Sequence, residues 1–232
     1  MNEQSRHTVT AFDEELAALE AMILELGDRA SAAMRQAMAA LADRDSVAAA
    51  RVVEKDGAID ALQAKAEALA VNIIALRAPM ADDLRTVVAA IKISALLERT
   101  ADYARNIARR VPEVTAKYPK PLRQTLERMS DEAGTMLTDI VKAYATRDVA
   151  LAEAVTAHDD IVDALHDELT EGLIQLMIER PDQIGQAAHL LFIGKHIERI
   201  GDQATNIAEM VTYAATGRQP PVRDTDGERL AA

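Results

Sequence analysis

Residues 196–211 read HIERIGDQATNIAEMV, and residues 96–111 read LLERTADYARNIARRV. The two stretches align at an offset of 100 and share a glutamate, an arginine, an aspartate and an asparagine in the same order. The matched residues are Glu98 with Glu198, Arg99 with Arg199, Asp102 with Asp202, and Asn106 with Asn206. Such self-similarity indicates that the chain contains two copies of one structural unit.

A second pair of matching stretches supports the duplication. Residues 55–62 read KDGAIDAL and residues 158–165 read HDDIVDAL, at an offset of 103. This match pairs Asp56 with Asp159, and Asp60 with Asp163. The proline-rich stretch VPEVTAKYPKP, residues 111–121, joins the two copies.

The seven prolines leave long intervals in which apolar residues recur every three or four positions. This period is typical of amphipathic helices, and a proline inside a helix costs about 3 kcal/mol. We therefore expect helices over residues 8–42, 46–76, 80–111, 119–146, 149–179 and 182–215. The predicted fold is all-α, with two tandem three-helix bundles over residues 8–115 and 116–217. A disordered tail is expected at residues 218–232.

Polar residues mark the expected start of two of these helices. Asp45 or Ser46 can cap the second helix by accepting a hydrogen bond from a free backbone N–H. The second copy repeats the pattern around Asp148.

Composition and charge disfavour several classes of function. A formal net charge of −12 over 232 residues disfavours binding to nucleic acid or to an anionic membrane surface. The chain has no cysteine, which excludes disulfides, thiolate zinc sites and thiol nucleophiles. No signal sequence or membrane span is recognisable, so a soluble, cytoplasmic protein is expected.

Eight carboxylates are expected to meet in two groups. Residues equally far from the turn of a helical hairpin lie level with each other. Asp60 and Glu98 are equidistant from Pro79, as are Asp56 and Asp102. Asp163 with Glu198, and Asp159 with Asp202, are likewise equidistant from a point beside Pro181. On the third helix, Glu98 and Asp102 continue the apolar stripe formed by Leu84, Val88, Ile91 and Ala95, which predicts partial burial.

Two interpretations of these groups stay open. Unpaired buried carboxylates are costly, and a multivalent cation would offset that cost; all-oxygen ligands suit magnesium, calcium, manganese or iron. Asn106 and Asn206 would then orient ligands or form packing hydrogen bonds. The alternative is ordinary ion pairing, because Arg99 and Arg199 follow the glutamates and Lys92, Arg105 and Lys195 are near in sequence. A metal-free structural helical adaptor would need nothing more.

The histidines argue against a conventional catalytic metal site. His158 and His196 are near the second group in sequence, but their counterparts in the first copy are Lys55 and Leu96. A di-metal carboxylate oxidoreductase on a helical bundle would use Glu-x-x-His on two helices, and the nearest match is Asp163 with His166 alone. Phosphate-binding loops, dinucleotide fingerprints and nucleophile elbows are not found. The chain is therefore not expected to be an enzyme.

The resemblance is to the PhoU family of bacterial phosphate-transport regulators. It covers residues 8–217 and is carried by PMADDLR and IKISALLERTADYARNIA in the first copy and by GKHIERIGDQATNIAEMVTYAATG in the second. The resemblance implies two three-helix bundles related by a pseudo-twofold axis. It also implies metal binding, carried over residue by residue to Asp56, Asp60, Glu98, Asp102, Asp159, Asp163, Glu198 and Asp202.

For function, the resemblance implies signalling. PhoU proteins help the phosphate ABC transporter inform a sensor histidine kinase that phosphate is plentiful, so that the phosphate regulon stays repressed. The expected partners are the transporter's nucleotide-binding subunit, the kinase and a second copy in a homodimer. Candidate partner contacts are Asp83 and Arg85, whose motif the second copy lacks, and the cationic pair Arg109 and Arg110. The expected cofactor is a divalent or trivalent metal ion.

Overall fold

The computed structural model describes residues 3–218, with side chains from residue 11, and this range contains helices and no strands. The α-helices are α1 (Glu3–Asp43), α2 (Ser46–Lys55), α3 (Gly57–Arg77), α4 (Ala81–Arg110), α5 (Lys120–Thr146), α6 (Val149–Glu179) and α7 (Ile184–Thr216). Two 3-10 helices, η1 (Val111–Glu113) and η2 (Pro181–Gln183), follow α4 and α6. The all-α prediction is confirmed, and the predicted helix ends are within a few residues of those observed. Residues 219–232 of the predicted tail lie outside the described range.

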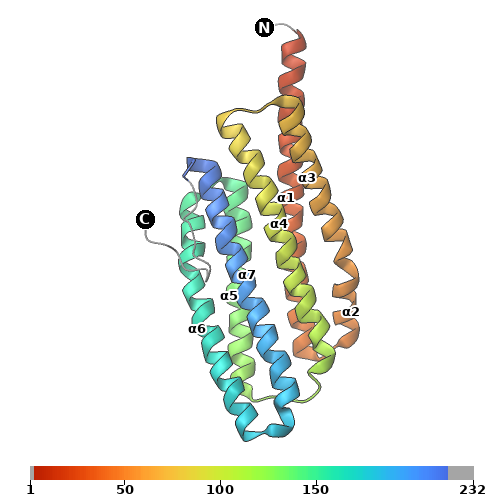
Figure 1. The fold of residues 1–232 in the computed structure, drawn as a ribbon, viewed down its shortest axis with the longest axis vertical. Coiled ribbons are helices and arrows are strands. Elements are labelled where there is room, and N and C mark those ends of the chain that lie inside the picture. The colour runs from red at the N-terminus through yellow and green to blue at the C-terminus, as the bar shows by residue number, and fades with distance from the viewer. Residues whose placement is uncertain (1–2, 219–232) are drawn as a thin grey trace.

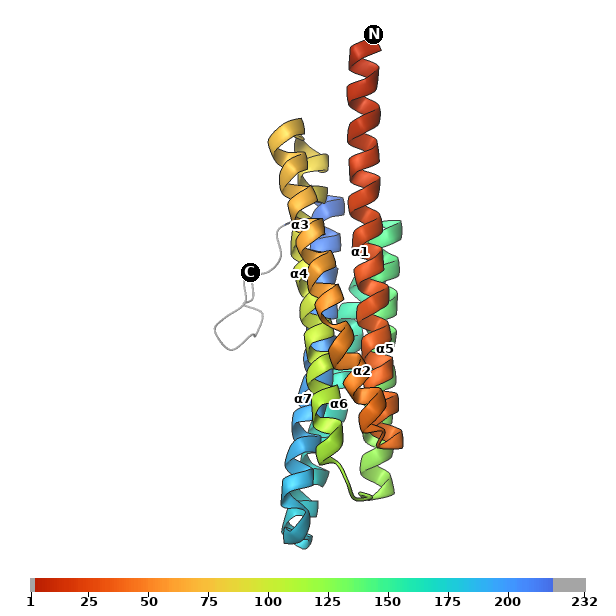
Figure 2. The ribbon, with the colours of Figure 1, turned by 90° about the vertical axis from the view of Figure 1, so that its right-hand side faces the viewer.

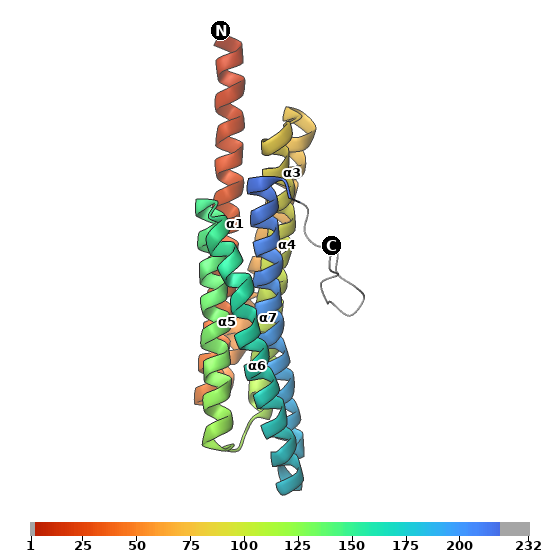
Figure 3. The same ribbon diagram turned by 90° about the vertical axis from the view of Figure 1, so that its left-hand side faces the viewer.

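The helices form one elongated bundle (Figure 1). Side views show α1 and α5 on one side of the molecule and α4 and α7 on the other (Figures 2 and 3). The segment α2–α3 covers one flank by packing on α1 and α4, and α6 covers the other by packing on α5 and α7. Because α4 also packs on α7 and α1 on α5, the two halves share one continuous apolar core.

The helix starts confirm the capping prediction. Asp45 caps α2, because its Oδ1 accepts hydrogen bonds from the backbone N–H groups of Val47 and Ala48, both at 2.9 Å. Asp148 caps α6 by accepting from Leu151 N–H at 3.0 Å. The preceding residues, Arg44 and Arg147, both adopt a left-handed conformation with φ of 54°.

The second predicted helix is wrong in one respect, because it is broken into α2 and α3 at Asp56. Asp56 keeps helical dihedral angles, but its carbonyl accepts from Ile59 N–H at 2.7 Å, a tighter i to i+3 bond. Gly57 follows directly, and glycine is a poor helix former. The break lets the Asp56 side chain, only 9% exposed, point toward α4.

The predicted stripe on the third helix is not the most buried face of α4. Leu84 is 37% exposed and Ala95 is exposed. A fully buried row lies one residue before the predicted stripe, with Val87, Ala90 and Leu97 each at most 1% exposed. The reason is that α4 packs on three neighbours, which are α1, α7 and the α2–α3 segment. Its strongest burial faces α1 and α7, and the predicted stripe lies on a less buried side of the helix.

The two hairpin turns hold the carboxylate-bearing helices side by side. Ala78 ends α3 in a left-handed conformation, with its N–H bonded to Ile74 at 3.2 Å, and Pro79 follows. At the other hairpin, Pro181 opens η2 between α6 and α7. None of the helices in the described range is long and apolar enough to cross a bilayer.

Candidate metal centres

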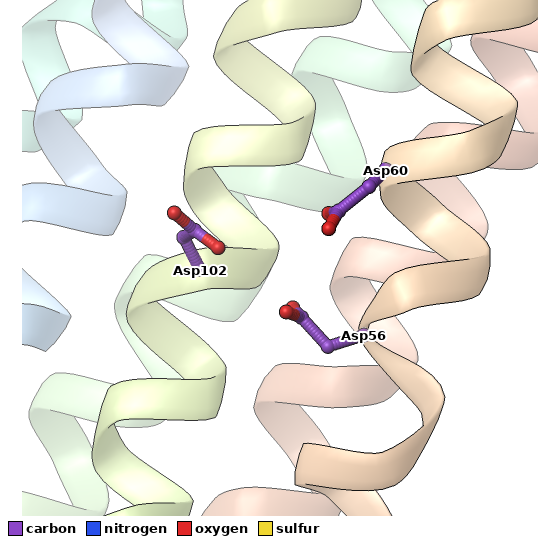
Figure 4. Close-up of side chains that lie close together, drawn as sticks. All are labelled: Asp56, Asp60 and Asp102. Carbon is purple, nitrogen blue, oxygen red and sulfur yellow. The ribbon is translucent and has the colours of Figure 1, made fainter.

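Three of the four carboxylates predicted to meet in the first half do so. Asp56, at the break between α2 and α3, and Asp60, in the first turn of α3, face Asp102 on α4 (Figure 4). One oxygen from each of the three lies within 4.8 Å of the others. Asp56 is buried, Asp102 half-buried and Asp60 exposed, so the group opens toward solvent on one side. We call Asp56, Asp60, Glu98 and Asp102 the first centre.

Arg105 reaches into the first centre from one helical turn beyond Asp102. Its Nη1 donates to Asp102 Oδ1 at 2.7 Å and also to Asp56 Oδ2. The Arg105 side chain is only 20% exposed, so this is a partly buried ion pair and solvent screens it less than a surface pair. Arg105, one of the cations named as near in sequence, thus pairs with two carboxylates of this half.

Glu98 lies outside the group of three but within electrostatic reach of it. Partial burial raises the pKa of Glu98 above its ordinary value, and the charges of Asp102, Asp60 and Asp56 raise it further. Burial likewise raises the pKa of Asp102, with Arg105 opposing the shift. The first centre thus carries more negative charge than its one guanidinium neutralises.

The second half presents Asp159 and Asp163 from α6 toward Glu198 and Asp202 on α7; we call these four the second centre. Burial raises the pKa of Asp159 to about 7, and Asp163, Asp202 and Glu198 raise it in that order. The pKa of Asp163 is also raised, first by burial and then by Glu198. Within the described part of the chain these four carboxylates do not close into a group as tight as that of the first centre.

Two oxygens of the second centre have no hydrogen-bond partner within the described range. They are Asp159 Oδ1 and Glu198 Oε2, both buried. Gly201 leaves the space for Asp159, since a Cβ at that position would lie 2.9 Å from Asp159 Oδ1. Lys195 pairs with the other Glu198 oxygen at 2.6 Å, from a side chain that is 45% exposed. A cation would satisfy these two buried carboxylate oxygens, and carboxylate oxygens are the ligands that hard metal ions prefer, so the residues of the second centre fit a metal ion.

The raised pKa of Asp159 makes stability depend on pH when no metal is bound. The ordinary aspartate pKa is about 4, whereas that of Asp159 in the folded protein is about 7. The protonated carboxyl therefore contributes stability that is fully present below pH 4 and is lost as pH rises through 7. We expect Asp159→Asn to raise the melting temperature more at pH 8 than at pH 5. Thermal unfolding followed by circular dichroism with a chelator measures this. An equal shift at both pH values would contradict the raised pKa.

Both histidines near the second centre in sequence have other partners. His158 Nε2 lies 2.7 Å from Glu132 Oε2 on α5. The His196 ring stacks on Tyr103 of α4, with centroids 5.8 Å apart. Burial, together with Arg110 and Arg199, lowers the pKa of His196 to about 4, so this ring is neutral at pH 7. Neither histidine is placed as a ligand.

The pair α4–α7 carries a cationic and aromatic surface that the sequence analysis found only in part. Arg110 lies over the Phe192 ring at 4.1 Å, and Arg199 lies 5.8 Å from the centre of the Tyr103 ring. Phe192 is 52% exposed. We call Tyr103, Arg110, Phe192, His196 and Arg199 the cationic-aromatic face. Two phenylalanines and four tyrosines in the whole chain could have signalled it, because an exposed aromatic is conspicuous in such a composition.

The remaining predicted residues occupy separate places. Asp83 is exposed at the start of α4, and Arg85 pairs with Asp82 there. Arg109 and Arg99 are exposed, and Asn106 and Asn206 are half-buried. Asp83 and Arg85, at the α3–α4 tip, are thus far from Arg109 at the C-terminal end of α4. The roles predicted for these residues stay predictions.

Comparison with protein families gives one match over both halves. The model of the PhoU domain matches residues 23–111 and 126–211. Each matched segment contains one carboxylate centre.

Comparison with individual proteins agrees. A phosphate-specific transport system accessory protein PhoU homolog from Zymomonas mobilis is 47% identical over 97% of this chain and 95% of its own length. A homolog of the same name from Caulobacter vibrioides is 41% identical over 93% of this chain and 94% of its own.

Solved structures give the same answer. The crystal structure of PhoU from Pseudomonas aeruginosa has a TM-score of 0.86 at 30% identity, covering 89% of this chain and all of that chain. The phosphate transport system regulatory protein PhoU from Streptococcus pneumoniae has a TM-score of 0.85 at 29% identity, covering 91% of this chain and all of that chain.

Proposed function

The chain belongs to the PhoU family, and we propose that it links a phosphate ABC transporter to a sensor histidine kinase, so that the phosphate regulon is repressed when phosphate is plentiful. An accessory, non-enzymatic role in phosphate transport follows from the family and from the names of its relatives. The observation that carries the finer proposal is near-full-length similarity to accessory proteins of phosphate transport. The proposed place of action is the cytoplasm, where the transporter's nucleotide-binding subunit would be reached.

The regulatory role predicts a phenotype. Deleting the gene in the source bacterium should raise expression of a phosphate-regulon reporter in phosphate-rich medium, because the signal that phosphate is plentiful no longer reaches the kinase. Restoring the wild-type gene should return the reporter to its repressed level. Unchanged reporter expression in the deletion strain would argue against the role.

The cationic-aromatic face is the proposed contact with the nucleotide-binding subunit. Arginine and exposed aromatic side chains are enriched in the energetically important centres of protein interfaces. Burial of the half-exposed Phe192 beneath Arg110 would remove apolar area from water, and the guanidinium groups of Arg110 and Arg199 would meet carboxylates of the partner. Asp83 and Arg85 at the α3–α4 tip are proposed to contact the kinase.

Reversing the charge of this face is expected to weaken the complex. We expect Arg110→Glu to lower affinity for the purified nucleotide-binding subunit at least tenfold and Phe192→Ala to lower it severalfold, measured by biolayer interferometry. The matched control is Arg128→Glu, an exposed arginine of α5 on the opposite layer. Equal affinity of Arg110→Glu and the control would move the docking site elsewhere.

Metal binding is the second part of the proposal. The eight residues of the two centres would hold divalent or trivalent ions, with magnesium, manganese and iron as candidates for an all-carboxylate set. A bound ion would neutralise carboxylates that α2–α3 and α4, or α6 and α7, direct at each other, and so fix the geometry of each hairpin. Asn106, Asn206, Arg99 and Arg199 would act from outside the ligand set.

Self-association into a homodimer is also proposed, from the family resemblance alone. Light scattering on the purified protein measures the molar mass and would decide it. A di-metal oxidoreductase or a metal-free adaptor is favoured by no specific observation in the described residues.

A further inference from the structure

One position of the repeat carries a positive charge in the first half and a neutral side chain in the second. At the offset of 100 that aligns the repeats, Arg105 corresponds to Thr205. Arg105 bonds both Asp56 and Asp102, whereas the buried Thr205 hydroxyl donates only to the backbone carbonyl of Asp202, at 2.8 Å. The first centre therefore contains a cation of its own, at the place where a metal ion would bridge the two helices.

A position one helical turn earlier also favours a cation in the second centre. Ala101 in the first half corresponds to Gly201 in the second. Gly201 makes room for Asp159 Oδ1, since a Cβ there would lie only 2.9 Å away. This oxygen and Glu198 Oε2 are the two buried oxygens of the second centre that lack a hydrogen-bond partner within the described range. The second centre thus has buried oxygens available for an external cation, while Asp56 and Asp102 of the first are already paired with Arg105.

The shape of each centre follows from this difference. In the first, one guanidinium draws together Asp56 and Asp102, and with Asp60 they form a group within 4.8 Å. In the second, the ammonium of Lys195 pairs with Glu198 from a half-exposed side chain and leaves the aspartates of α6 to repel each other. A metal ion entering the first centre must displace Arg105 from Asp56 and Asp102. In the second centre it can bind Asp159 Oδ1 and Glu198 Oε2, which have no hydrogen-bond partner within the described range.

We propose that Arg105 is a built-in counterion that closes the first centre, so that metal ions fill the second centre first and the first centre only at higher concentration. This rests on the metal binding proposed above. Arg105 is a positioning and competing residue, not a ligand. At low metal concentration the chain would hold metal only in the α6–α7 hairpin.

The test is a titration of the purified full-length protein with manganese after chelator treatment, with free ion counted by electron paramagnetic resonance. Wild type should show the second centre binding at least tenfold more tightly than the first. In Arg105→Gln, which keeps a long polar side chain without the charge, the affinity of the first centre should rise at least tenfold. Arg128→Gln is the matched control and should titrate as wild type does.

A second set of variants, in which the second centre is disabled, assigns each binding phase to one of the two centres. Asp159→Asn with Glu198→Gln should remove the tight phase from wild type but leave a tight phase when combined with Arg105→Gln. Circular dichroism verifies that each variant is folded. Two equal phases in wild type, or a titration unchanged by Arg105→Gln, would overturn the inference while leaving metal binding intact. No manganese bound by any variant would overturn both.

Discussion

Leu97→Ala is expected to lower the free energy of unfolding by about 3 kcal/mol, within the range for leucine truncation in a core. Leu97 is 1% exposed at the point where four helices meet. It lines one small space with Ile23 of α1, Val141 of α5 and Ile207 of α7. The cost is large because these neighbours belong to both halves and cannot all move into the space left by the truncated side chain.

The same substitution tests whether the halves are independent. Since they share one core, calorimetry should show a single transition that moves as a whole to lower temperature. Leu76→Ala is the control, because Leu76 is 76% exposed and its truncation should change stability by less than about 0.5 kcal/mol. Two separated transitions, with only one displaced by Leu97→Ala, would show instead that each half folds alone.

Local signals predicted most of the fold because they act over a few residues. Asp45 and Asp148 cap the helices they were expected to start, and the turns at Pro79 and Pro181 place the hairpins. The break at Asp56 was not predictable from periodicity, because the apolar period continues across it. At the break, Asp56 pairs with Arg105 of α4, a contact between helices that periodicity does not report.

The buried face of α4 was harder to predict for a related reason. A helix with three neighbours carries apolar residues on most of its surface, so an apolar stripe at the correct period does not identify which neighbour it meets. Leu84 and Leu97 both fit helical periods, yet one is 37% and the other 1% exposed. Burial on α4 is decided by its packing on α1 of the same half and on α7 of the other.

The carboxylate centres were partly predictable. Counting from the hairpin turns brought Asp56, Asp60 and Asp102 to one level, and the structure places them together. The repeat, however, does not tell whether the two centres are equivalent. The difference between them lies at Arg105 and Thr205, outside the acidic motifs, where comparing only the shared residues of the repeats overlooks it.

The double variant Asp159→Asn with Glu198→Gln is expected to lose the stabilisation that metal binding at the second centre gives to wild type. Without metal it should be more stable than wild type at pH 8, because two carboxylates that repel each other in a partly buried place become neutral amides. With manganese at about 100 times the dissociation constant of the second centre, that centre should add about 2.7 kcal/mol to the stability of wild type. The variant should lose this gain and keep only the smaller one from the first centre.

The order of stability of the two proteins should therefore invert on adding manganese, measured by chemical denaturation with and without the ion. Glu153→Gln with Glu171→Gln is the control, since it removes two exposed carboxylates from the same helix α6 and changes net charge equally. Affinity for manganese in the double variant should fall more than about 100-fold, because both unpartnered oxygens lose their charge. A variant that manganese stabilises as much as wild type would show that the ion binds elsewhere. The crossing of the two stability curves is diagnostic, because a purely structural defect would lower stability under both conditions.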